Sequence, residues 1–142
     1  MEIKGNVETY NRIQEQAKTL FMKYGMRSVS MDDIAGELGM SKKTIYQYFA
    51  DKDELVDAVV EQDIRDMQID CNFCFNEASD AIDEIFMTMD RILGHFRDLN
   101  PMLLYDLQKF HFNSYKKFKE NKDTFLLEII RKNMQRGIEE GL

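Results

Sequence analysis

Helix-breaking residues are scarce along the whole sequence. One proline, Pro101, and seven glycines occur among 142 residues. Proline removes a backbone hydrogen-bond donor and glycine carries extra backbone entropy, so both disfavour helix interiors. Ten methionines and many Glu, Lys and Leu residues, which favour helices, occupy the stretches between them. The composition therefore predicts an all-α fold.

Apolar side chains recur at helical spacing through most of the chain, and this periodicity locates the expected helices. We expect them at about 7–24, 30–38, 42–49, 52–75, 80–97, 101–112 and 115–137. The predicted inward-facing side chains of the first, second and fourth helices are Tyr10, Ile13, Ala17, Leu20, Phe21, Tyr24, Ile34, Ala35, Leu38, Leu55, Val56, Val59, Val60, Ile64, Met67, Cys71 and Cys74. Those of the fifth and last helices are Ile82, Ile85, Phe86, Met89, Ile92, Leu93, Phe96, Phe118, Phe125, Leu126, Ile129, Ile130 and Met134.

Polar residues and glycines mark the ends of several of these helices. Two of the expected N-caps are followed three positions later by an acidic residue, Asp33 or Glu54, which is the spacing of a reciprocal capping box. The expected N-caps are Ser30, Ser41, Asp51 and Asn100, and the expected C-terminal stops are Gly25 and Gly39.

The segment 30–49 meets the requirements of a helix-turn-helix. Two short helices that cross closely need a small residue at the crossing, and Ala35 stands there. The tight turn between them needs a residue that accepts positive φ, and Gly39 stands there. Ile45 then fixes the second helix to the core. The opposite face of that helix, with Lys42, Lys43, Thr44, Gln47 and Tyr48, is free to enter a major groove.

The same stretch resembles a known family. Residues 31–55 contain the long and specific pattern Ile-Ala…Leu-Gly…Ser…Thr-Ile-Tyr-x-Tyr-Phe-x-x-Lys-x-x-Leu, which is similar to the DNA-binding region of TetR-type (tetracycline-repressor-like) regulators. The resemblance covers the first part of the chain well and the remainder only in helix pattern. It implies a homodimeric repressor on a palindromic double-stranded DNA operator. It also implies that the C-terminal helices bind a small-molecule effector, which releases the DNA.

The resemblance assigns roles to individual residues. Tyr46 and Lys52 are implied to contact phosphates, while Leu38, Ile45 and Phe49 are implied to be structural. Ser30 stands at a helix N-terminus, where backbone amides favour an anion, so it also suits a phosphate. The full expected DNA-binding set is Ser30, Ser41, Lys42, Lys43, Thr44, Tyr46, Gln47, Tyr48 and Lys52.

We expect two regions in the chain. Residues 1–52 form the helix-turn-helix domain, and residues 53–142 form a helical region for effector binding and dimerisation. Members of the family usually continue with further helices that build most of the dimer interface, so the C-terminal region is expected to be short. The apolar stripe of the last helix is then expected either to be exposed or to pair with a two-fold mate.

Net charge excludes one class of nucleic-acid protein. A formal charge of −7 and a pI near 4.9 argue against a protein that coats nucleic acid without specificity. The short stretch with Lys42, Lys43, Lys52 and a single Asp51 is nevertheless locally basic. No apolar run approaches the length needed to span a bilayer, and the N-terminus MEIKGNVETY has no apolar signal core. We expect a cytoplasmic protein without membrane contact.

The pair Cys71-x-x-Cys74 leaves an alternative open. Both thiols fall on one helical face, and His95 on a neighbouring helix would suit a thiol-redox or metal-sensing protein. Without a second cysteine pair, small buried apolar residues are the more common interpretation. A third possibility is an interaction module with a vestigial helix-turn-helix. We expect no metal and no cofactor.

The sequence contains no catalytic constellation, so we do not expect an enzyme. Methionine and aromatic side chains suit adaptable apolar pockets. The expected effector pocket, for a small and largely apolar molecule, is lined by Met67, Phe86, Met89, Phe96, Met102, Tyr105 and Phe110.

Overall fold

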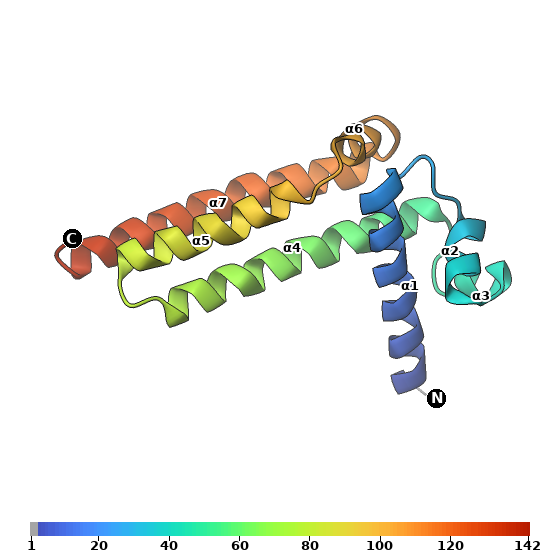
Figure 1. The fold of residues 1–142 in the computed structure, drawn as a ribbon, viewed down its shortest axis with the longest axis horizontal. Coiled ribbons are helices and arrows are strands. Elements are labelled where there is room, and N and C mark those ends of the chain that lie inside the picture. The colour runs from blue at the N-terminus through green and yellow to red at the C-terminus, as the bar shows by residue number, and fades with distance from the viewer. Residues whose placement is uncertain (1–2) are drawn as a thin grey trace. The chain divides into compact units, whose positions relative to one another are not determined.

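A computed structural model describes residues 3–142, with side chains from residue 7 onward. This part of the chain is all-helical, as the composition predicted. Its helices are α1 (Ile3–Tyr24), α2 (Met31–Leu38), α3 (Lys42–Tyr46), α4 (Lys52–Glu77), α5 (Ala81–Arg97), α6 (Pro101–Phe110) and α7 (Phe112–Glu139), in the order that Figure 1 shows. No helix in the described range combines the length and apolar character that a membrane span requires.

The helix bounds follow the sequence prediction with two notable differences. α3 ends at Tyr46 instead of near Phe49, because the next amides turn back to bond Thr44 and Ile45 in a tighter geometry. α7 begins at Phe112, directly after the His111 cap, and so starts earlier than the expected residue 115. The predicted caps at Ser30, Ser41, Asp51 and Asn100 are confirmed.

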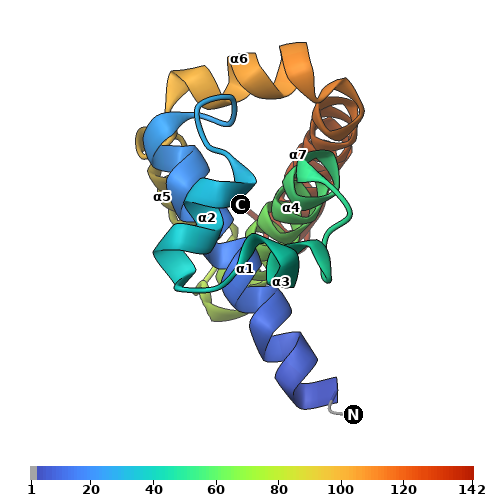
Figure 2. The same ribbon diagram turned by 90° about the vertical axis from the view of Figure 1, so that its right-hand side faces the viewer.

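The helices form two compact units. The first contains residues 1–61 and 100–116, and the second contains 62–99 and 117–142. The first unit therefore includes α6, which contacts α1, and the first turns of α4 (Figure 2).

The first unit has a continuous apolar core. Side chains from α1, α2, α3, the start of α4 and α6 meet in it, and burial of this apolar surface is what orders helices as short as α3. The core residues are Ile13, Ala17, Leu20, Phe21, Met26, Val29, Ile34, Ala35, Ile45, Phe49, Leu55, Val56, Leu103 and Leu107.

Three residues expected inside this core lie at its border. Tyr24 is exposed, and Leu38 is only half-buried. Tyr10 is partly exposed and stacks on Phe49 with ring centroids 4.7 Å apart. A tyrosine suits this border position, because its ring can pack on the core while its hydroxyl stays near water.

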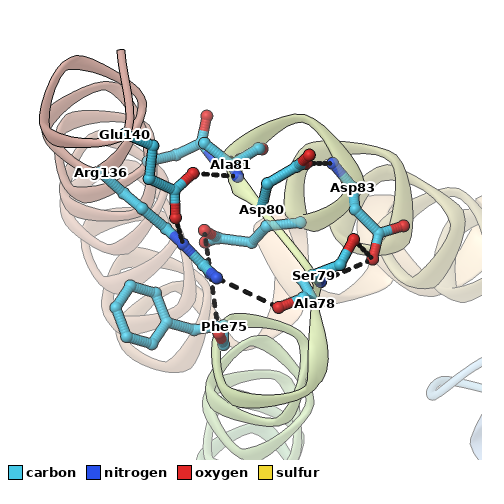
Figure 3. A network of polar contacts seen from close by, with 10 residues as sticks. Phe75, Ala78, Ser79, Asp80, Ala81, Asp83, Arg136 and Glu140 are labelled. Atoms are coloured by element: carbon cyan, nitrogen blue, oxygen red, sulfur yellow. Dashed lines mark hydrogen bonds and ion pairs between the residues drawn. The ribbon is translucent and has the colours of Figure 1, made fainter. Parts of the chain in front are cut away.

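In the second unit, Arg136 ties the loop between α4 and α5 to the end of α7 (Figure 3). Its guanidinium donates to the backbone carbonyls of Phe75 (2.8 Å) and Ala78 (3.1 Å). It also donates to the Glu140 carboxylate at 2.8 Å, whose other oxygen accepts from the Ala81 amide at 2.8 Å. The ends of three helices are thus joined by one side chain.

α5 buries its polar side instead of its apolar side. Its buried residues are Ala81, Glu84 and Thr88, and Glu84 accepts a hydrogen bond from Arg136 at 3.2 Å. The prediction that the apolar stripe of α5 faces inward is therefore wrong in the described structure. Periodicity identifies a stripe but not the direction in which it points, and the largely buried Arg136 requires a carboxylate on the facing side. The exposed stripe consists of Ile82, Ile85, Phe86, Met89, Leu93 and Phe96.

On α7 too, the observed burial differs from the prediction, but at fewer positions. Ile130 and Met134, expected to be buried, are exposed, whereas Asn133 between them is buried and donates to the Ala81 carbonyl at 2.9 Å. The remaining predicted residues of this helix are partly buried: Phe118, Phe125, Leu126 and Ile129.

Candidate nucleic-acid interface

The turn between α2 and α3 has the backbone that the sequence predicted. Gly39 adopts φ 66° and ψ 28°, the left-handed conformation that favours glycine. The next amide, that of Met40, bonds the Ala35 carbonyl at 3.0 Å and closes the helix end. A Cβ at Gly39 would meet no atom within 4 Å, so the backbone conformation and not the available space selects glycine here.

The start of α2 is closed by a reciprocal capping box. The Ser30 hydroxyl accepts from the Asp33 amide at 3.0 Å, and the Asp33 carboxylate accepts from the Ser30 amide at 2.9 Å. The hydrogen bond from the Ser30 backbone amide, followed by one from the Ser30 side chain, lowers the pKa of Asp33. Ser30 itself is exposed.

α3 is positioned by one cap and one buried anchor. The Ser41 hydroxyl accepts from the Thr44 amide at 3.1 Å, and Ile45 is completely buried. Because Ile45 points into the core, its neighbours on the opposite side of this short helix face outward. The exposed or half-exposed outer set is Lys42, Lys43, Thr44, Tyr46, Gln47 and Tyr48.

The outer side chains differ in whether they form hydrogen bonds or ion pairs within the protein. Lys42 pairs with Asp32 at 3.5 Å, but both side chains are at least half exposed, so the pair is weak. Lys43 and Gln47 make no side-chain hydrogen bond or ion pair within residues 7–142. These two side chains are therefore the ones most available to an external ligand.

Lys52, an expected phosphate contact, is placed differently. Its ammonium is partly buried and donates to the Met26 carbonyl. Burial lowers the pKa of Lys52, while the carboxylates of Asp106, Asp33 and Asp53 act in the opposite direction. In this conformation a phosphate would compete with an internal bond for the ammonium.

Residues 13–59 match the family model described as bacterial regulatory proteins, tetR family. The matched range contains most of α1, both helices of the turn and the start of α4. Residues 13–59 of this chain are thus similar to the DNA-binding region of the TetR family.

Other transcriptional regulators are similar to this chain over a longer stretch. The HTH-type transcriptional regulator YvaF of Bacillus subtilis is 37% identical over 89 residues, which are 62% of this chain and 47% of YvaF. The match thus spans about half the length of that relative. A transcriptional regulator from Cytophaga hutchinsonii is 26% identical, with a TM-score of 0.77 over 91% of this chain and 66% of that one.

One further solved structure is similar in fold alone. A regulator from Saccharomonospora viridis, solved in complex with choline, has 19% identity and a TM-score of 0.56 over 92% of this chain and 72% of that one. The helical fold of these two regulators therefore extends over the second unit of this chain as well, as the helix pattern predicted.

The second unit of this chain contains a cleft between α4, α5 and α7. Its volume is about 740 Å³. Both aromatic and charged side chains line the cleft. The lining residues are Cys71, Asn72, Phe75, Asn76, Glu84, Phe125, Glu128, Ile129, Arg131, Lys132, Gln135, Arg136 and Glu139.

The residues expected to line an effector pocket lie elsewhere. Met67 borders a small gap of about 10 Å³ beside Phe118 and Phe125. The other expected residues are exposed: Phe86, Met89 and Phe96 on α5 in the second unit, and Met102, Tyr105 and Phe110 on α6 in the first. Their role as effector contacts remains a prediction.

The thiols do not have the properties of a redox or metal-sensing pair. Both cysteines are free and buried. Burial, followed by the neighbouring Cys74, raises the pKa of Cys71 to about 11. A reactive thiol needs the opposite shift, because the thiolate is the nucleophile. The His95 imidazole lies 3.6 Å from the Asp63 carboxylate.

Sequence reasoning missed the buried polar residues. Arg136 and Glu140 do have the i, i+4 spacing of a helical ion pair, which gave a usable signal. Nothing in the sequence indicated that Glu84 and Asp106 are buried, because an acidic residue on a helix is normally solvated. Each is only 3% exposed.

Proposed function

We propose that this chain is a sequence-specific DNA-binding repressor that acts as a homodimer on a palindromic operator. The observation that carries the proposal is the outer face of α3. Gly39 fixes the turn, Ile45 fixes the helix, and Lys43 and Gln47 are left facing solvent. A helix held in this way fits the major groove, where base edges carry a distinct donor and acceptor pattern.

The proposed contacts divide into two kinds. Ser30, Tyr46 and Lys52 bind phosphates, which position the helix-turn-helix without reading sequence. Ser41 caps α3 and lies at the edge of the same face. The residues proposed to face base edges are Lys42, Lys43, Thr44, Gln47 and Tyr48.

Selection of bound duplexes from a random pool tests this function. We expect the recovered sequences to share an inverted repeat whose half-sites lie about one helical turn apart, since the two copies of the helix-turn-helix must read one side of the duplex. Affinity for the selected duplex should fall steeply with salt. Recovery of unrelated duplexes with equal affinity would instead favour an interaction module with a vestigial helix-turn-helix.

We further propose that residues 1–52 recognise the DNA sequence, and that residues 53–142 bind the effector and form the dimer. The cleft of the second unit is the proposed effector site. Its wall combines rings such as Phe75 and Phe125 with charged groups such as Lys132. An effector with both an apolar body and a polar group fits this wall better than the largely apolar molecule expected from sequence.

A ligand screen by thermal shift, followed by operator binding, tests the effector. A true effector raises the melting temperature and weakens operator binding, because it must prefer the conformation that does not bind DNA. Phe75→Ala should remove both effects. Choline, found in complex with a regulator of the same fold, is a reasonable first probe, although 19% identity assigns only the fold.

A further inference from the structure

Asp106 on α6 is a buried carboxylate that reaches outside its own helix. It is 3% exposed. One of its oxygens accepts a hydrogen bond from the backbone amide of Arg27 at 3.1 Å, although the two residues are 79 positions apart in sequence. A buried carboxylate must find donors or a cation, so this contact is a requirement of the site as well as a link to the α1–α2 connection.

The α1–α2 connection lies very close to the same carboxylate. Gly25 adopts φ +86°, and a Cβ on it would lie 3.1 Å from Asp106 Oδ2 and 3.6 Å from the Met102 side chain. The glycine therefore permits both the turn and the close approach of α6. Two further contacts hold the same region: Asn100 donates to the Lys23 carbonyl at 3.3 Å, and the Arg27 guanidinium lies over the Phe110 ring at 4.9 Å.

A second segment meets this region through Lys52, the first residue of α4. Its ammonium donates to the Met26 carbonyl, within the α1–α2 connection. Among the carboxylates that oppose the effect of burial on the pKa of Lys52, that of Asp106 acts most strongly. The pair α2–α3 occupies residues 31–46. The segment before this pair bonds Asp106 through the Arg27 amide, and the segment after it bonds the neighbouring Met26 carbonyl through Lys52.

We propose that Asp106 is a positioning residue for DNA binding, which holds the Arg27 amide, attracts the Lys52 ammonium through its charge, and so fixes the orientation of α2 and α3. This role rests on the proposed function. It goes beyond the recognition face, because Asp106 touches no DNA: it acts through the two flanks of the helix-turn-helix from α6, a helix outside the sequence motif.

Charge removal is the first test, with operator affinity measured on the full chain. Asp106→Asn keeps the size and one acceptor oxygen but loses the charge. We expect the operator Kd to rise about tenfold, the factor that corresponds to one charge-assisted hydrogen bond. Asp106→Ala, which also loses the acceptor, should raise it further. Gln108→Ala, an exposed position on the same helix, should leave the Kd unchanged.

Two controls separate positioning from simple loss of stability. Leu107→Ala removes a buried α6 side chain without touching the carboxylate, so it should lower the melting temperature but not the affinity of the folded protein. In a Lys52→Gln background, Asp106→Asn should cost little more, because the cation that its charge attracts is already gone. Hydrogen exchange at the Arg27 amide should be faster in Asp106→Ala than in Leu107→Ala.

The outcomes that overturn the proposal are distinct from those that overturn the function. If the wild type selects an operator and Asp106→Asn binds it equally well, or its effect adds fully to that of Lys52→Gln, Asp106 has no positioning role. If the wild type binds no duplex, the proposed function fails and this role fails with it. Unchanged Arg27 exchange in Asp106→Ala would overturn the structural link itself.

Discussion

The guanidinium of Arg136 lies 3.2 Å from the carboxylate of Glu84, which is almost completely buried. The same guanidinium satisfies the carbonyls of Phe75 and Ala78, where α4 ends. A buried ion pair adds little when it is compared with an apolar replacement, but removal of one partner leaves the other charge buried and unpaired. The stability of the second unit is therefore expected to depend on Arg136.

Arg136→Met should destabilise the protein strongly, because it leaves the Glu84 carboxylate, 3% exposed, without its cation. Stranding a buried charge in this way costs about 3–5 kcal/mol. Urea unfolding monitored by circular dichroism measures the change. Arg131→Ala is the matched control, because the Arg131–Glu128 pair lies on the same helix with side chains 72% and 43% exposed, and its loss should have little effect. Equal effects of the two substitutions would contradict the assigned role of Arg136.

Two glycines, one within α2 and one directly after it, should respond in opposite directions to alanine. Gly39→Ala places a side chain at φ 66°, so it should destabilise the protein by about 1–2 kcal/mol. Gly36 has helical backbone, and a Cβ on it would meet no atom within 4 Å, so Gly36→Ala should stabilise the protein by up to about 1 kcal/mol. Thermal unfolding of both variants checks the pair. Stabilisation by Gly39→Ala would mean that the turn does not have this conformation.

Glu140 should make the second unit sensitive to acid. The bond from Arg136, and next that from the Ala81 amide, lower the pKa of Glu140 in the folded protein. Stabilisation by a carboxylate with a lowered pKa is complete above its unfolded pKa and is lost as the pH falls through the folded value. Glu140→Gln should therefore be less stable than wild type at neutral pH, and the difference should shrink as the pH falls below the unfolded pKa of a glutamate, about 4.3. A difference that grows on acidification would contradict this sign.

The thiol of Cys71 should react slowly in the native protein. With a pKa of about 11, it stays protonated at pH 8, whereas an unfolded thiol with a pKa near about 8.5 is partly ionised. Labelling with a disulfide reagent should be at least about 100-fold slower in buffer than in denaturant, in proportion to the thiolate fraction. Rapid native labelling of Cys71 would revive the thiol-sensing alternative.

The helix-turn-helix was predictable because its determinants are local. Ser30 with Asp33, the glycine at 39 and the anchor Ile45 each act through neighbours a few residues away, so their spacing in sequence determines their geometry. The all-α fold and most helix bounds followed from the same kind of information. The exposed face of α3 followed directly, because a short helix with one buried anchor has only one outer side.

The second unit was less predictable because its determinants are distant. The orientation of α5 depends on Arg136, which is 52 positions from Glu84 in the sequence. The apolar stripe of α5 has a clear period, but no local rule says that the opposite side meets a largely buried arginine. The cleft residues and the place of Lys52 were missed for the same reason: each depends on a contact between segments far apart in sequence.

The most direct test of sequence recognition is a repeat of the duplex selection with Gln47→Ala and Lys43→Ala, beside Lys119→Ala, an exposed position of the second unit, as control. The side chains of Lys43 and Gln47 have no internal partner within the described residues 7–142, so each substitution removes groove contacts and little else. We predict that both variants lose preference at one or two positions of each half-site, at a cost of about 1–3 kcal/mol per base contact, while Lys119→Ala selects the wild-type operator. Identical operators and affinities for all of these proteins would contradict the assignment of the α3 face to sequence reading.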